Sequence, residues 1–136
     1  MPGETNLSNL LRSMQPLLHD SAFTYCSLTP ERAMALADFA WGTFWEPEGV
    51  TLILPKMLAE VHELQQQPDW ALITLTVHSS LTAVGFLATI SQALASAGIS
   101  LNVVSAFYHD HLFVPWDDRL EALAILERLA DIGLPV

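Results

Sequence analysis

The sequence predicts an α+β protein of the ferredoxin-like class, built from two βαββα halves with antiparallel sheets and with helices packed on one sheet face. Two observations lead to this prediction. The order strand, helix, strand, strand, helix is expected twice along the chain. The halves also show a slight repeat with an offset of 60 residues, in which 52–55 (Leu-Ile-Leu-Pro) align with 112–115 (Leu-Phe-Val-Pro). Strands that are joined by helical crossovers, with a hairpin between them, favour this layered arrangement.

The first part of the chain is expected to form a helix and then the first half. Leucine and methionine recur at three- and four-residue spacing over 6–18, and Asn6 can cap this helix. Thr29 and Pro30 are typical of a helix start, because threonine caps free N–H groups and proline fits the first helical position. The expected elements are helix 6–18, strand 23–28, helix 30–38, strand 39–45, turn 46–49, strand 50–54 and helix 56–66.

The second half has clearer signals. Residues 72–77 are continuously apolar or β-branched, as in a strand that is buried on both faces. Gly98 is a typical helix stop, and Asp117 or Asp118 can cap the last helix. The expected elements are strand 70–78, loop 79–84, helix 85–97, strand 99–107, turn 108–110, strand 111–114 and a final helix. We therefore divide the chain into an N-terminal helix and two halves, namely 1–20, 21–68 and 69–136. The sequence does not identify the fourth strand of either half.

Composition and charge restrict the classes of function. The chain has 15 acidic and 5 basic residues, for a net charge of −10. This balance disfavours nucleic acids and anionic membranes as partners, although it also suits plain solubility. The N-terminus lacks the basic and apolar parts of a signal peptide. The single cysteine, Cys26, cannot form an internal disulfide, so we expect a cytoplasmic protein in which Cys26 is a buried thiol.

The predicted helix 85–97 carries no charged residue on any face. An ordinary surface helix keeps a charged side toward water, and Ala88, Ser91 and Ala95 are small enough to allow close approach of another element. We therefore expect its outer face to be covered by the other half or by a second subunit, which predicts a homodimer or larger oligomer. The alternative is a neutral exposed surface of small polar residues.

Several segments resemble the ACT-domain family, in particular small bacterial proteins with two such domains in tandem. They are residues 73–85, 97–104 and 107–115, with 46–54 similar to the first half of those proteins. The arrangement is also similar, more distantly, to the paired ACT domains of aspartate kinases and cytosolic arginine sensors. The resemblance implies a regulatory, non-catalytic module. It also implies that an amino acid or similar small metabolite binds at the loop before the first helix of a repeat.

The local chemistry around the start of helix 85–97 suits such a ligand. A glycine at a helix start lets a ligand approach the backbone, and the free N–H groups there favour a carboxylate. Asn102 can accept from an α-amino group, and an acidic residue can receive a cationic side chain. Taken with the resemblance, the predicted ligand-binding residues are Ser79, Ser80, Val84, Gly85, Phe86, Asn102, Glu48 and Asp110. In the structural alternative, Gly85 only permits tight packing, and Ser79 and Ser80 only cap the helix.

His109 and His111 form the most enzyme-like feature. On an extended chain both imidazoles point to the same side, as two metal ligands could, but the spacing identifies no further ligand except the weak candidate His78. The alternative is a polar hairpin turn in which Asp110 hydrogen-bonds its own backbone. The sequence has no phosphate loop, dinucleotide fingerprint or nucleophile elbow, so we expect no cofactor. Three hypotheses remain: a ligand sensor, an interaction module without a ligand, and a metal-dependent enzyme at the histidines.

Overall fold

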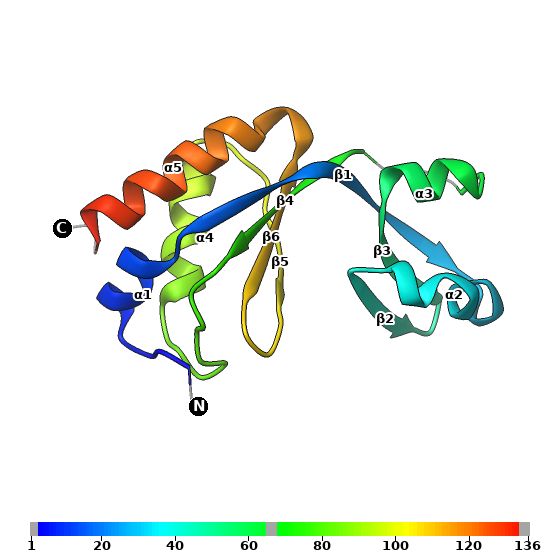
Figure 1. The fold of residues 1–136 in the computed structure, drawn as a ribbon, viewed down its shortest axis with the longest axis horizontal. Coiled ribbons are helices and arrows are strands. Elements are labelled where there is room, and N and C mark those ends of the chain that lie inside the picture. Colours follow the sequence, from blue (N-terminus) through cyan, green and yellow to red (C-terminus); the bar gives the residue numbers. More distant parts are fainter. Residues whose placement is uncertain (1–2, 65–67, 134–136) are drawn as a thin grey trace. The chain divides into compact units, whose positions relative to one another are not determined.

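The computed structural model describes residues 3–64 and 68–133, and the chain divides into two compact units. Unit 1 comprises Met1–His19 and Ala71–Val136, and unit 2 comprises Asp20–Trp70. The predicted α+β class with antiparallel pairing is confirmed in both (Figure 1). None of the helices in the described part of the chain is long and apolar enough to span a bilayer. The exact boundaries of the two predicted halves stay a prediction.

Unit 2 has the strand order β2-β3-β1, with both pairs antiparallel. Its elements are β1 (Pro16–Leu28, of which the part from Asp20 belongs here), α2 (Pro30–Leu36), a 3-10 turn (Ala37–Phe39), β2 (Gly42–Glu46), β3 (Gly49–Pro55) and α3 (Lys56–Val61). Glu46 pairs with Gly49, which confirms the predicted turn between β2 and β3. The core consists of apolar side chains from β1, β3 and the helices: Cys26, Leu28, Ala33, Leu36, Val50, Leu52, Leu54, Ala59 and Leu64.

Unit 1 packs three helices on one face of its strands. Its elements are α1 (Leu7–Ser13), β4 (Trp70–Leu75, from Ala71), α4 (Phe86–Ser96), β5 (Asn102–Ser105), β6 (Asp110–Pro115), a 3-10 turn (Trp116–Asp118) and α5 (Arg119–Ile132). Alternate strand residues enter the core, because successive side chains of a strand point to opposite faces. The core side chains of β4 and β6 are Ala71, Ile73, Leu75, Leu112 and Val114, and those of the helices include Leu10, Leu11, Phe86, Ile90, Leu94, Ala122 and Leu126.

The fourth strand of unit 1 comes from the N-terminal part of the chain. The strand order is β1-β4-β6-β5, so Pro16–His19 of β1 lie beside β4. The backbone N–H of Thr76 donates to Met14 O at 2.8 Å, and Thr76 Oγ1 donates to Gln15 O at 3.0 Å. The position that the sequence left open is therefore filled by residues that precede unit 2 in the chain.

The predicted helix 6–18 is wrong in its second half. Helix α1 ends at Ser13, and Leu17 and Leu18 lie in β1. Pro16 explains the difference, because a proline disfavours the helical conformation of the residue before it. Gln15, between α1 and β1, has a positive φ of 41° and so lies outside the right-handed helical region. Leucines at helical spacing were thus divided between a helix and a strand.

The predicted helix starts are mostly confirmed. Asn6 Oδ1 accepts from the N–H of Asn9 at 3.0 Å, and Thr29 Oγ1 accepts from that of Arg32 at 3.4 Å. Gly98 follows α4 with φ +74°, as expected for a helix stop. Asp118 precedes α5, but its side chain makes no capping hydrogen bond. Of the predicted helix 56–66, α3 forms the part up to Val61, and residues 65–66 lie outside the described residues.

Candidate functional site

A cavity of about 130 Å³ lies in unit 1 between the loop after β4, the start of α4 and the adjoining ends of β5 and β6. Five of the predicted ligand-binding residues line it, namely Ser79, Ser80, Gly85, Phe86 and Asp110. Leu81, Ala83, Leu87, Ala88 and Ser105 complete the described wall. The structure thus brings together residues from three separate segments of the sequence.

The N-terminus of α4 supplies one side of the cavity. Gly85 occupies the N-cap position with φ +91°, a conformation that glycine adopts without the steric penalty of other residues. Its carbonyl accepts from the N–H and the hydroxyl of Thr89, both at 2.9 Å, which starts the helix. No side chain caps the helix, and no described residue accepts from the N–H groups of Phe86, Leu87 or Ala88. These groups and the helix dipole favour an anion.

Asp110 supplies a carboxylate, a hydrogen-bond acceptor, on another side of the same cavity. Its side chain is buried, with the residue only 5% exposed, and Oδ2 accepts a hydrogen bond from Ser79 Oγ at 2.9 Å. In the β5–β6 register Asp110 pairs with Ser105, so the strand ladder fixes its position. Of the described lining residues Asp110 alone is charged, and within the described chain no lysine or arginine pairs with it. Because a buried carboxylate is unfavourable without a cation, this point of the cavity favours a positively charged group.

The other predicted residues lie elsewhere. Val84 is 84% exposed and is not part of the wall. Asn102 begins β5 and pairs with Phe113, at the opposite end of that strand from Ser105. Glu48 lies in unit 2, in the turn between β2 and β3. Ser105 was missed by the sequence prediction, although the register of the β5–β6 hairpin could have placed it opposite Asp110.

The loop that carries Ser79 and Ser80 is held by the N-terminal segment. The N–H of Glu4 donates to His78 O at 2.8 Å, and the N–H of Ser80 donates to Glu4 O at 2.9 Å. Gly3 lies so close to this loop that a Cβ atom there would approach Ser80 N to 2.5 Å. Neither serine caps α4, since Ser79 bonds Asp110 and Ser80 Oγ bonds Thr82 Oγ1 at 2.8 Å. The predicted capping role is therefore wrong.

The two histidines beside Asp110 make structural hydrogen bonds. His109 Nδ1 donates to Val77 O at 3.2 Å, and His111 Nδ1 lies 2.9 Å from Thr74 Oγ1, which is itself 2.8 Å from His19 Nε2. Burial lowers the pKa of His111, and the positive charges of His109 and His19 lower it further, against the opposing effect of Asp110.

The histidine hairpin also differs from its predicted form. The turn is closed by a hydrogen bond from Ala106 N to His109 O at 2.9 Å, and Asp110 begins β6 and bonds Ser79 instead of its own backbone. Within residues 3–64 and 68–133, no group of three or more His, Cys, Asp or Glu side chains is arranged to hold a metal ion.

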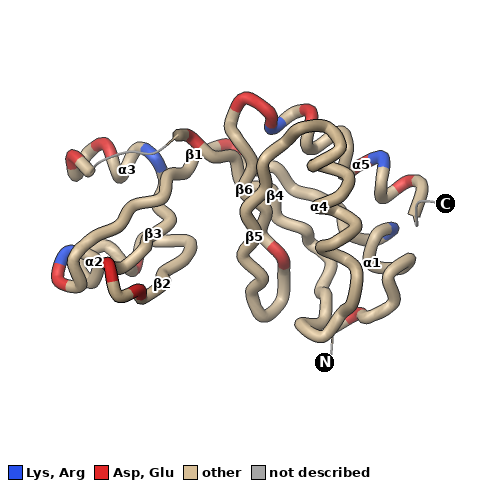
Figure 2. The backbone as a smooth tube through the Cα atoms, turned by 180° about the vertical axis from the view of Figure 1, so that it is seen from behind, with Lys and Arg blue, Asp and Glu red and all other residues tan. Residues whose placement is uncertain are grey.

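Helix α4 carries no charged residue, as Figure 2 shows, so its outer face is free of charge. Ala88, Ser91 and Ala95, the small residues of the sequence prediction, are all exposed there. Next to them an open groove of about 430 Å³ runs between α4 and α5. Its described lining consists of Ala88, Thr89, Gln92, Ala93 and Leu129.

Comparisons with known proteins show two family matches in tandem. Two models described as ACT domain match residues 2–69 and residues 66–128. No curated protein matches the chain.

Solved structures show the same architecture. A Vibrio cholerae protein of unknown function, described as a possible transport protein, is 39% identical with a TM-score of 0.80, and the match covers 91% of this chain and 95% of that one. An Agobacterium tumefaciens protein is 17% identical with a TM-score of 0.66, over 85% and 87% of the two chains. The regulatory subunit of aspartate kinase from Thermus flavus is 14% identical with a TM-score of 0.59, over 84% and 95%. The last two similarities are similarities of fold.

Proposed function

The chain belongs to the ACT-domain family, and from this premise we propose that it is a regulatory module, without catalytic activity, that binds a small α-amino acid in the cavity of unit 1. ACT domains typically bind amino acids in regulatory roles. The observation that carries the proposal for this chain is the pairing, in one cavity, of an uncapped helix N-terminus with a buried carboxylate. These two features are complementary to the two charges that every free α-amino acid carries.

The ligand carboxylate is assigned to the start of α4. The N–H groups of Phe86, Leu87 and Ala88 are free to donate, and Gly85 has no side chain to block the approach. Helix N-termini with free N–H groups bind carboxylates through these hydrogen bonds and the helix dipole. Ser80 adds a hydroxyl at the wall of the cavity.

The ligand ammonium is assigned to Asp110. A charged hydrogen bond to an ammonium would give the buried carboxylate the cationic partner that the described chain does not supply. The sequence prediction gave Asp110 to a cationic side chain, but the volume argues for the α-ammonium. A cavity of about 150 Å³ holds a molecule the size of benzene. The present cavity of about 130 Å³ therefore suits glycine, alanine or serine better than lysine or arginine.

A thermal-shift screen of the full chain against the twenty amino acids tests this proposal. A ligand at 100 times its Kd should stabilise the protein by about 2.7 kcal/mol, which raises Tm by several degrees. We expect a response to a small amino acid, and we expect Ser105→Leu, which narrows the cavity from an exposed position, to remove it. A protein that responds to no small amino acid, or a response that Ser105→Leu leaves intact, would contradict the proposal.

A second proposed function is self-association, and it is favoured by the charge-free face of α4 and the groove beside it. In a chain of net charge −10, two copies meet with the least electrostatic repulsion at a surface that carries no charge. We expect Gln92→Glu, within the groove, to shift a dimer toward monomer in light scattering after gel filtration. Ser21→Glu adds the same charge at an exposed position of β1, outside α4 and the groove lining, and should have less effect. A monomeric wild type at high concentration would contradict this second function.

A further inference from the structure

The N-terminal strap, residues 3–6, contacts the loop that forms one wall of the unit 1 cavity. Figure 1 shows this segment beside the loop that follows β4, and Glu4 and Ser79 form a parallel β-bridge there. The N–H of Glu4 donates to His78 O at 2.8 Å, and the N–H of Ser80 donates to Glu4 O at 2.9 Å. The strap therefore fixes the backbone on both sides of Ser79, which lines the cavity.

Gly3 lies directly against the backbone of the same loop. A Cβ atom at this position would approach Ser80 N to 2.5 Å and the carbonyl carbon of Ser79 to 2.6 Å, which is far closer than non-bonded atoms pack. These are backbone atoms, so they cannot turn aside as the end of a flexible side chain can. The strap can therefore lie where it does only because residue 3 is glycine.

The other end of the strap is anchored to α1. Glu4 Oε1 accepts from Asn9 Nδ2 at 2.7 Å, and Asn6 Oδ1 accepts from the N–H of Asn9 at 3.0 Å. Leu10 and Leu11 of the same helix are fully buried in the core of unit 1. The strap thus joins the loop to the core through α1.

Helix α1 also contacts the second wall of the cavity. A Cβ atom at Gly85, the N-cap residue of α4, would lie 3.5 Å from Leu7 Cδ2, so Leu7 packs beside the start of α4. Leu7 directly follows the strap in the sequence. One continuous segment therefore contacts the loop of Ser79 and the helix start, the two parts between which the ligand is proposed to bind.

Most hydrogen bonds that hold this loop involve Glu4. In the described part of the chain, three hydrogen bonds join residues 78–83 to the rest of unit 1, and two of them are the backbone bonds with Glu4. The third runs from Ser79 Oγ to Asp110. Leu81, in the middle of the loop, is 65% exposed. Loss of the strap would therefore leave the loop with one of its three hydrogen bonds.

We propose that the N-terminal strap is a positioning element of the unit 1 site. It holds Ser79 in hydrogen-bond contact with Asp110 and holds the loop at the distance from α4 at which the cavity accepts its ligand. The strap does not touch the ligand, since neither Gly3 nor Glu4 lines the cavity. Docking and release of residues 3–6 then regulate affinity from outside the cavity. The effect on ligand binding rests on the proposed function, whereas the effect on Ser79 and Asp110 does not.

Amide hydrogen exchange of the ligand-free full chain, followed by NMR, tests whether the strap holds the loop. Gly3→Ala places a Cβ atom against the loop backbone and should speed exchange of the Ser80 N–H at least tenfold. Glu4→Pro removes the N–H that donates to His78 O and should act in the same direction. The N–H of Thr89, in α4, should exchange as in the wild type. Unchanged exchange of Ser80 in both variants would overturn the proposal.

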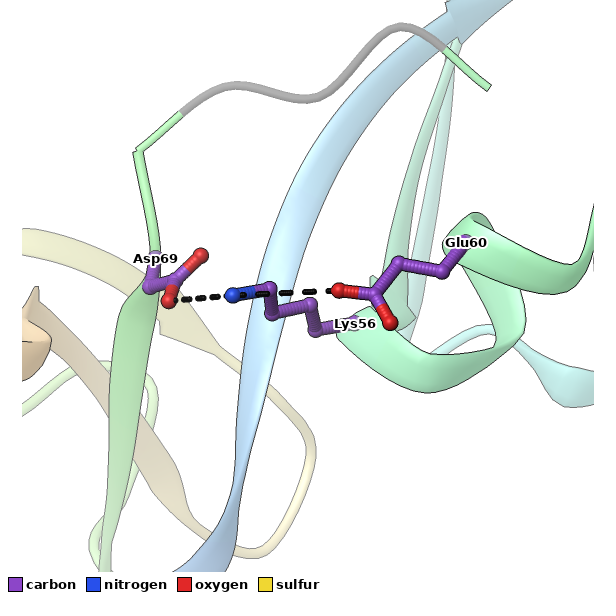
Figure 3. Close-up of polar contacts among 3 residues, drawn as sticks. All are labelled: Lys56, Glu60 and Asp69. Carbon is purple, nitrogen blue, oxygen red and sulfur yellow. Dashed lines mark hydrogen bonds and ion pairs between the residues drawn. The ribbon is translucent and has the colours of Figure 1, made fainter. Parts of the chain in front are cut away.

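Two control variants separate the strap from a general loosening of the chain. Thr5→Ala changes an exposed side chain within the strap and should leave the exchange of Ser80 unchanged. Lys56→Gln removes the ion pair in which Lys56 Nζ lies 2.7 Å from Asp69 Oδ2, a contact within unit 2 (Figure 3). It should also leave the exchange of Ser80 unchanged. If either control speeds this exchange as much as Gly3→Ala does, the strap has no specific role.

A double-mutant cycle tests whether the strap positions Ser79 on Asp110. Ser79→Ala should lower the Tm of the wild type, because it removes the hydrogen bond to Asp110. In the Gly3→Ala background the same change should lower Tm by at most half as much, because the released loop no longer holds this bond in place. An equal fall of Tm in both backgrounds would contradict the positioning of Ser79.

Isothermal titration calorimetry with L-serine and L-alanine tests the consequence for the ligand. Gly3→Ala should weaken binding at least fivefold, whereas Glu4→Gln, which keeps the backbone bonds and an oxygen that accepts from Asn9, should bind as the wild type does. If Gly3→Ala speeds the exchange of Ser80 but binds as the wild type does, the positioning role is wrong and the proposed function stands. If the wild type binds neither amino acid, the proposed function is wrong, while a smaller effect of Ser79→Ala in Gly3→Ala still supports the strap.

Discussion

The hydrogen bond between Ser79 and Asp110 gives the sharpest prediction about stability. Ser79→Ala removes the hydroxyl that donates to Asp110 Oδ2 at 2.9 Å. Both residues are buried, at 6% and 5% exposure, so water does not readily replace the lost donor. The variant therefore leaves a buried carboxylate with fewer hydrogen bonds, which is unfavourable.

The expected magnitude follows from the charge of the acceptor. Hydrogen bonds to charged groups contribute about 1.5–3 kcal/mol, compared with about 1 kcal/mol for neutral pairs. We therefore expect Ser79→Ala to lower the free energy of unfolding by about 2 kcal/mol. At roughly 3 °C per kcal/mol for a chain of this size, Tm should fall by about 6 °C.

Differential scanning calorimetry measures this effect, with Ser80→Ala as the matched control. Ser80 lies next to Ser79 but bonds Thr82 at an exposed position, so its replacement should change the free energy of unfolding by less than about 0.5 kcal/mol. In a double-mutant cycle, Ser79→Ala should cost about 1 kcal/mol instead of about 2 kcal/mol once Asp110→Asn has removed the charge, because the amide oxygen of asparagine still accepts the hydrogen bond. Equal effects of Ser79→Ala and Ser80→Ala would refute the reasoning.

Three further predictions concern pH, reactivity and packing. The lowered pKa of His111 means that the unfolded chain, with a histidine pKa of about 6.5, binds more protons than the native state. His111 therefore does not lower the free energy of unfolding above about pH 6.5, but it lowers this free energy as the pH falls below that value. In urea titrations at several pH values, His111→Gln should make this decrease smaller. Cys26, only 4% exposed and with a raised pKa, should react with a thiol reagent roughly a hundredfold more slowly in the native protein than in denaturant. Ile90→Ala removes a fully buried side chain of α4 and should cost about 2–4 kcal/mol, whereas Ser91→Ala on the exposed face should cost little.

Features that depend on neighbouring residues were predictable from the sequence. The caps Asn6 and Thr29, the stop at Gly98 and the turn 46–49 all depend on contacts within a few residues. Turn and cap preferences describe such contacts well. The continuous apolar run at 72–77 likewise predicted a strand buried on both faces, and β4 is buried from Ala71 to Leu75.

Features that depend on distant contacts were not predictable. Leu17 and Leu18 fit both a helical face and a strand; Pro16 separates them from α1, but no local pattern shows that they pair with β4. The fourth strand of unit 1 comes from residues that precede all of unit 2, so no local pattern marks it. Tertiary contacts decided the structure where the local preference was ambiguous.

The residues of the candidate site also divide into those with a local sequence signal and those that distant contacts bring into place. Gly85 was predictable because a glycine before a helix has a local signature. The contact of Ser79 with Asp110 joins residues 31 positions apart, and no spacing rule indicates it. Asn102 was selected as the polar residue of its strand, whereas the hairpin register places Ser105 opposite Asp110.

The central claim is that the unit 1 cavity binds a small amino acid through Asp110 and the start of α4. The most direct test is isothermal titration calorimetry of the full chain with L-serine and L-alanine, in the wild type, Asp110→Asn and the control Asp131→Asn, which changes an exposed aspartate of α5. The account predicts saturable binding of at least one of them by the wild type and Asp131→Asn, and at least tenfold weaker binding by Asp110→Asn. Equal affinities in Asp110→Asn and the wild type, or no binding of either amino acid, would contradict it.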